Sequence, residues 1–121
     1  MRKILPPTPS EGGGVKKKIY IAGKVTGEPI SECTMKFGAA QVDLERLGHT
    51  AVNPLAVVGD WKCPWDLAMR KCIRALMDCE MIFMLEDYKN SKGAMVEYEL
   101  ATMLGMEIIY ESSGFKRTKV Y

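Results

Sequence analysis

The sequence lacks several features that would assign a protein class directly. It has one histidine and four cysteines without a Cys-x-x-Cys pair, so it shows no metal-binding framework. No run approaches the ~18 apolar residues of a membrane span, and Pro6 and Pro7 interrupt the N-terminus before a signal-peptide core. Its 17 basic and 15 acidic residues leave a charge of +2, too small for a general nucleic-acid surface. We expect a cytoplasmic protein with reduced thiols, no metal or other cofactor, and no nucleic-acid or membrane partner.

What is present indicates one globular domain. The chain has 121 residues, of which 47% are hydrophobic and 26% charged, as in ordinary folded domains. Residues 1–15 contain Pro-Pro-Thr-Pro-Ser-Glu-Gly-Gly-Gly, which can bury almost nothing. We expect a flexible tail over residues 1–15 and a single domain over residues 16–121.

Short apolar runs alternate with segments of helical period. The runs at residues 19–22, 50–52, 81–85 and 108–110 predict strands covered on both faces. Apolar residues recur every three or four positions from Cys33 to Leu47, from about Pro64 to Leu76, and from about Ser91 to Leu104. This alternation predicts an α/β fold with a parallel sheet of four strands, or five if residues 117–121 add an edge strand.

Three segments follow the carboxyl ends of predicted strands, where open parallel sheets bind ligands. We interpret residues 23–29, 53–64 and 86–93 as loops. The first reads Gly23-Lys24-Val25-Thr26-Gly27, and its glycines, cation and hydroxyl suit an anion such as phosphate. It matches neither a dinucleotide-binding nor a P-loop motif, so a glycine-rich turn without a ligand is the alternative.

The helix predicted over residues 91–104 carries an unexpected carboxylate. Glu97 lies in the middle of an apolar arc, whereas Glu99 points away from it. The arc is formed by Gly93, Ala94, Val96, Leu100, Ala101, Met103 and Leu104. An unpaired buried charge costs several kcal/mol, so Glu97 either pairs with Arg70, Arg74 or a backbone donor, or faces a cleft. Gly93, one turn earlier, would leave space for a ligand beside it.

Ser91 begins the same helix. It is either the N-cap or part of a phosphate or hydroxyl site formed with the free amides that follow, and the two roles are compatible.

Several of these segments together resemble the nucleoside 2-deoxyribosyltransferase superfamily, in particular its small bacterial and phage members near the deoxynucleoside 5'-monophosphate N-glycosidases. They are Ile-Tyr-Ile-Ala-Gly at 19–23, Asn53-Pro54, and Ser-Lys-Gly-Ala-Met-Val-Glu at 91–97 followed by Ala101 and Leu104-Gly105. The resemblance spans about residues 18–110. It implies a flavodoxin-like three-layer sandwich and cleavage or transfer at an N-glycosidic bond, with Glu97 as nucleophile.

The resemblance also implies a small nucleotide or nucleoside ligand and a homodimer or higher oligomer. Ser91 stands where the monophosphate hydrolases contact phosphate. The candidate ligand contacts are Tyr20, Gly23, Lys24, Thr26, Gly27, Asn53, Ser91 and Gly93, with Trp61 or Trp65 as further candidates for stacking on the base. We expect Glu97 to be ionised at neutral pH, favoured by the helix N-terminus.

One position departs from the resemblance. The superfamily usually has an aspartate in the helix before the third strand, and here Cys72 aligns with it. A neutral thiol does not replace a carboxylate in acid–base work. Asp66 lies earlier in that helix and either contributes from another angle or is a first-turn residue that suits the helix dipole. The alternative function is therefore a catalytically inactive nucleotide-binding module; a purely structural protein would leave Glu97 unexplained.

Overall fold

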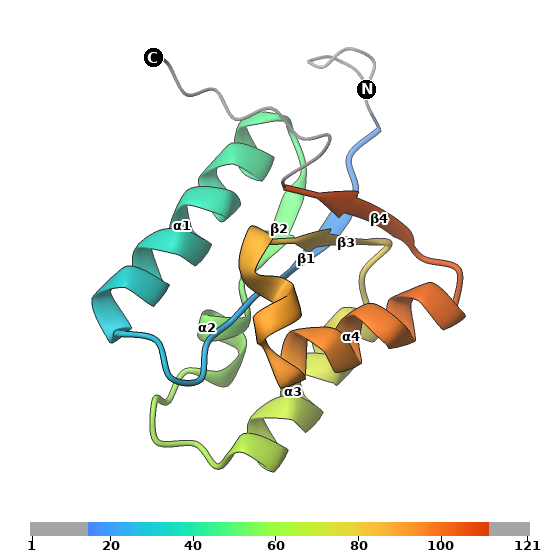
Figure 1. Cartoon of the computed structure of the whole chain (residues 1–121). Coiled ribbons are helices and arrows are strands. Elements are labelled where there is room, and N and C mark those ends of the chain that lie inside the picture. Colours follow the sequence, from blue (N-terminus) through green and yellow to red (C-terminus); the bar gives the residue numbers. More distant parts are fainter. Residues whose placement is uncertain (1–14, 112–121) are drawn as a thin grey trace.

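A four-stranded parallel sheet forms the centre of the molecule (Figure 1). The computed structural model describes residues 15–111. Its strands are β1 (Lys18–Ala22), β2 (Thr50–Val52), β3 (Met81–Met84) and β4 (Glu107–Tyr110), in the order β2-β1-β3-β4. Tyr20 pairs with Val52 on one side and with Ile82 on the other. The predicted strands and their parallel arrangement are confirmed, while the candidate strand at 117–121 and nearly all of the predicted tail lie outside the described residues.

Helices cover both faces of the sheet and make three layers (Figure 1). The helix α1 (Ile30–Arg46) covers one face, and α3 (Trp65–Met77) and α4 (Lys92–Met103) cover the other. The molecule has two hydrophobic cores, one on each face of the sheet. The residues of β1 contribute to them in turn, because successive side chains of a strand point to opposite faces. Ile19 and Ile21 pack with α1, whereas Tyr20 and Ala22 pack with α3 and α4. This confirms the α/β class and matches a flavodoxin-like sandwich.

Two segments that we interpreted as loops contain short helices. The segment after β2 forms α2 (Pro54–Val58), and the one after β3 begins with the 3-10 helix η2 (Glu86–Asn90). Asn53 caps α2, since its Oδ1 accepts a hydrogen bond from Leu55 N at 2.9 Å. Gly59 ends α2 with a φ of 70°, in the left-handed region that favours glycine. Both helices have five residues, too few to show a helical period in the sequence.

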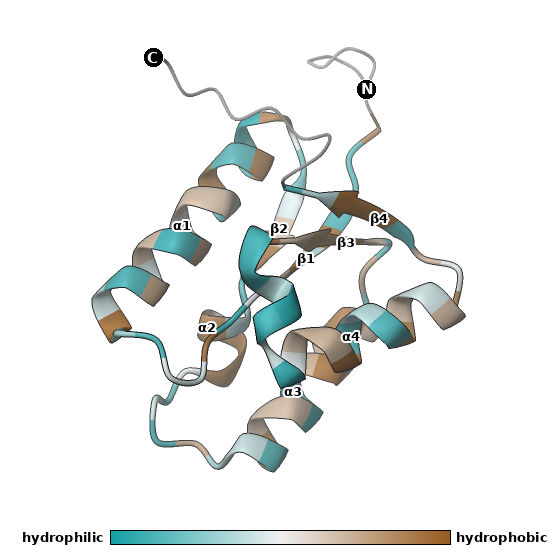
Figure 2. Cartoon of the chain, in the orientation of Figure 1, coloured by the Kyte–Doolittle hydropathy of each residue, from teal (hydrophilic) through white to brown (hydrophobic). Residues whose placement is uncertain are grey.

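The helix ends are more exposed than the apolar pattern predicts. Trp65, at the first position of α3, is 41% exposed, and Met103 and Leu104, at the end of α4, are 81% and 58% exposed. Strands of four residues span ~13 Å and a twelve-residue helix ~18 Å, so the helix ends extend beyond the sheet. Figure 2 shows mostly hydrophobic strands at the centre and a hydrophilic η2 outside them. Within residues 15–111, no helix has the length and apolar character to cross a bilayer.

Candidate functional site

A cleft lies at the carboxyl ends of the strands, where successive connections between strands run toward opposite edges of the sheet. From β1 the chain passes to β2 at one edge, and from β2 it crosses over β1 to β3. In open α/β sheets the crevice at such a switch point, beyond the carboxyl ends of the strands, binds ligands. The cleft here has a volume of about 810 Å³, within the range typical of small-molecule sites.

The cleft brings together almost every site residue predicted from the sequence. Lys24 does not line it. Those that do are Tyr20, Gly23, Thr26, Gly27, Asn53, Ser91, Gly93 and Glu97. They come from β1, the segment after it, the start of α2 and the first half of α4, four parts of the chain that the parallel topology gathers at one edge.

Glu97 is buried in the wall of this cleft. Its side chain faces the sheet from the same side of α4 as Ala94 and Ala101, and the residue is 5% exposed. The Tyr20 hydroxyl, from the middle of β1, donates a hydrogen bond to Glu97 Oε2 at 2.8 Å. Arg70 and Arg74 are exposed on α3, and within residues 15–111 neither forms an ion pair with Glu97. The proposed arginine partners are therefore wrong, and a tyrosine hydroxyl takes their place.

The protonation of Glu97 is set by its burial. Burial raises the pKa of this carboxyl from 4.5 to about 7, although the Tyr20 hydrogen bond opposes the rise. The pKa of Tyr20 is raised well above its usual value, first by burial and then by the neighbouring carboxylate. The raised pKa differs from our expectation that Glu97 is fully ionised at neutral pH. At neutral pH the protonated and ionised forms are both populated.

Cys72 lies beside the Tyr20–Glu97 pair. It projects from α3, is 7% exposed and lines the cleft. Burial raises the pKa of the Cys72 thiol to about 11, while a hydrogen bond with Tyr20 opposes this rise. The thiol is therefore neutral at physiological pH. Asp66 is exposed in the first turn of α3 and does not line the cleft.

The two glycines nearest the pair have packing roles. A Cβ at Gly23 would lie 2.5 Å from Leu85 Cδ1, so glycine lets the end of β1 pack against the residue that follows β3. A Cβ at Gly93 would lie 2.9 Å from Met69 Sδ. The space that we expected above Glu97 is therefore partly occupied by Met69 of α3, a contact that the sequence alone did not indicate.

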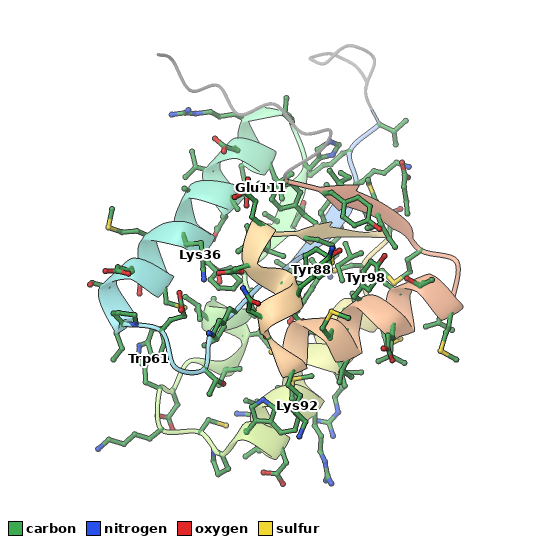
Figure 3. The ribbon with its side chains drawn as sticks, viewed as in Figure 1. Lys36, Trp61, Tyr88, Lys92, Tyr98 and Glu111 are labelled. Atoms are coloured by element: carbon green, nitrogen blue, oxygen red, sulfur yellow. The ribbon has the colours of Figure 1, made fainter. Side chains whose placement is uncertain are left out.

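An ionic network behind the cleft holds the segment after β1. Lys36 Nζ, from α1, donates to the Lys24 carbonyl at 2.8 Å and also contacts Glu28 Oε1 and Asp87 Oδ2. Lys24 N donates to Asp87 Oδ1 at 3.0 Å. The segment is thus tied to α1 and η2 (Figure 3). Lys36 gave no signal in the sequence, because it is one of several lysines on polar faces.

Carboxylates and aromatic rings are among the groups that line the cleft. Glu28 and Asp60 join Glu97 in its walls, and within residues 15–111 no lysine, arginine or histidine lines it. Trp61 and Trp65 also line it and are 49% and 41% exposed. Residues 15–111 contain no group of three or more His, Cys, Asp or Glu side chains placed to hold a metal ion. The cleft therefore offers carboxylates and indole rings to a ligand, while the Tyr20 hydroxyl is engaged with Glu97.

Comparison with known families identifies the domain. The family described as a domain of unknown function (DUF4406) matches residues 17–110, from the start of β1 to the end of β4. The chain belongs to the DUF4406 family. No curated protein matches it. The DUF4406 domain thus includes every element that lines the cleft, and the nucleoside 2-deoxyribosyltransferase assignment stays a prediction.

Proposed function

We propose that this DUF4406 domain cleaves or transfers at the N-glycosidic bond of a nucleoside or nucleoside 5'-monophosphate, with Glu97 as the nucleophile. The observation that supports this most directly is the Glu97 carboxyl in the cleft wall, oriented by the Tyr20 hydroxyl at 2.8 Å. A buried carboxyl with a single orienting donor in a ligand-sized cleft is typical of a catalytic group.

The geometry suits attack at an anomeric carbon. Breaking a C1'–N bond develops positive charge at the sugar, which an adjacent carboxylate stabilises and traps as an ester. The Tyr20 hydrogen bond engages Oε2, which leaves Oε1 to form the bond to C1' while the C1'–N electron pair departs with the base. Water then attacks C1', which breaks the ester to Glu97, gives the free sugar and supplies the proton that neutralises the departed base. A second base that attacks C1' instead gives transfer.

This mechanism needs the ionised form of Glu97. Because its pKa is about 7, the reactive fraction increases as the pH rises through neutrality. Base release should therefore increase from pH 6 to pH 8 and then level off, unless a second group titrates.

The test is base release from a panel of nucleosides and nucleoside 5'-monophosphates, followed by chromatography. Glu97→Gln should abolish release while ligand binding persists. The matched control is Glu99→Gln, which changes an exposed glutamate two positions away on α4 and should leave the rate unchanged. Release that continues in Glu97→Gln at the wild-type rate would refute the nucleophile assignment.

A catalytically inactive nucleotide-binding module is the second candidate. Cys72 favours it, because a buried neutral thiol stands where the resemblance implies an acidic group. Nucleotide binding without any base release by the wild-type chain would support this candidate. Sedimentation of the same sample tests the homodimer or higher oligomer that we propose with either function.

A further inference from the structure

We infer that the cleft selects a nucleoside whose base carries a positive charge, such as a pyridinium or an N7-alkylated purine, and that it disfavours a 5'-phosphate. The inference rests on the proposed function of Glu97 and narrows its substrate class. It comes from the carboxylates and indole rings that share the cleft and from the neutral thiol at position 72.

The carboxylates make the cleft attractive to a cation. Glu28 is partly compensated, since its Oε1 lies 3.3 Å from Lys36 Nζ. Asp60 is exposed in the turn after α2, where its Oδ1 accepts a hydrogen bond from Lys62 N at 2.9 Å. In the part of the chain that the structure describes, Asp60 forms no ion pair, so its negative charge is available at the cleft wall. A phosphate placed there would be repelled, whereas a cationic ring would be attracted.

The indole rings suit a flat cation. Trp61 lines the cleft with about half of its surface exposed, and a positively charged heterocycle stacks favourably on such a face. The ring of Trp65 already forms a cation–π interaction, because Lys92 Nζ lies 4.6 Å from the ring centroid. We therefore assign the base-stacking role to Trp61 (Figure 3).

A charged base also removes the need for a general acid. A neutral base must gain a proton as it leaves, but Cys72 is a neutral, weakly acidic thiol and the Tyr20 hydroxyl is engaged with Glu97. A cationic base takes the C1'–N electron pair and departs neutral. With water as the second reactant, the balanced products are the free sugar, the neutral base and one proton, which is lost when water attacks the ester.

The positive charge of the base would also favour the reactive, ionised form of Glu97. A cation next to Glu97 favours its ionised form, which opposes the effect of burial on its pKa. The substrate would thus generate the carboxylate that attacks it, whereas an uncharged nucleoside would meet a mixture of ionised and protonated Glu97.

The test compares pairs of ligands that differ in charge by one small group, a methyl group on the base or a phosphate on the sugar. Cationic bases leave faster in water as well, so binding is measured by calorimetry in Glu97→Gln, using N7-methylguanosine against guanosine and nicotinamide riboside against its 5'-monophosphate. We expect N7-methylguanosine to bind about tenfold more tightly than guanosine, and the riboside more tightly than the monophosphate. Asp60→Asn should reduce the first preference, and Trp61→Ala should weaken binding of the cation. Asp78→Asn, at the end of α3 outside the cleft, should change neither.

The outcomes separate this inference from the proposed function. Equal binding of guanosine and its methylated form, or tighter binding of the monophosphate, overturns the charge preference. If the wild-type chain nevertheless releases uncharged bases and Glu97→Gln does not, the proposed function stands without it. If Glu97→Gln still cleaves, or if no member of the panel binds, the proposed function itself is wrong and the charge preference falls with it.

Discussion

Replacing Glu97 with glutamine should change how the stability of the domain depends on pH. The folded pKa of about 7 stands against an ordinary value of 4.5. Between these values the folded chain keeps a proton that the unfolded chain releases, so the free energy of unfolding falls as the pH rises and the loss is complete above about pH 7. The difference corresponds to about 3 kcal/mol, a large part of the 5–15 kcal/mol that is typical of a whole domain.

Glutamine does not titrate, so the variant should not share this loss. The assay is urea unfolding of wild type and Glu97→Gln at intervals from pH 4 to pH 8. We expect the stability of the variant relative to wild type to increase by about 3 kcal/mol over this range, or on the order of 10–20 °C in melting temperature. Other titrating groups contribute to both proteins and cancel in the difference.

Glu99→Gln is the matched control, because Glu99 is exposed on the same helix. Its stability relative to wild type should be nearly constant with pH. A flat difference for Glu97→Gln as well would mean that Glu97 titrates like an exposed carboxyl. That result would refute the reasoning on desolvation and, with it, the pH dependence proposed for catalysis.

Three further predictions concern the cleft. Tyr20→Phe removes the hydrogen bond that lowers the Glu97 pKa, so the midpoint of the pH–rate profile should move above about 7; an unchanged midpoint would contradict the role of Tyr20. Gly23→Ala places a methyl group 2.5 Å from a leucine carbon and should cost about 1–3 kcal/mol in urea unfolding, whereas Gly38→Ala, with open space around it, should be neutral or stabilising. Asn53→Ala removes the cap of α2 and should cost about 1 kcal/mol; no loss would show that α2 is held by packing alone.

Most of the fold follows from local pattern. The apolar runs and the spacing of Cys33, Phe37, Ala40 and Leu44 predict β1 to β4 and α1, and all four of these α1 residues are buried. Ser91 caps α4 as expected, with its Oγ accepting a hydrogen bond from the Ala94 amide. Short helices such as α2 leave too little periodicity to be found. Helix ends such as Trp65 are misjudged because the pattern does not tell how far the sheet extends.

The candidate site could be predicted from the sequence to a similar extent. An acidic residue on an apolar arc singled out Glu97, and the segments that follow the carboxyl ends of the predicted strands indicated the edge of the sheet at which a ligand would bind. The Tyr20 hydroxyl as the partner of Glu97, Met69 against Gly93, and the Lys36 network behind the cleft have no counterpart in any local motif.

The amino-acid sequence by itself determined the α/β alternation, the Ser91 cap of α4 and the placement of a carboxyl on the inner face of α4, because these depend on spacing within one segment. Only the tertiary structure decided which groups meet that carboxyl and how strongly it holds a proton. Tyr20 and Glu97 are 77 positions apart, and the desolvation that raises the Glu97 pKa comes from elements packed around it. Distance and burial are properties of the assembled layers, so no local pattern contains them.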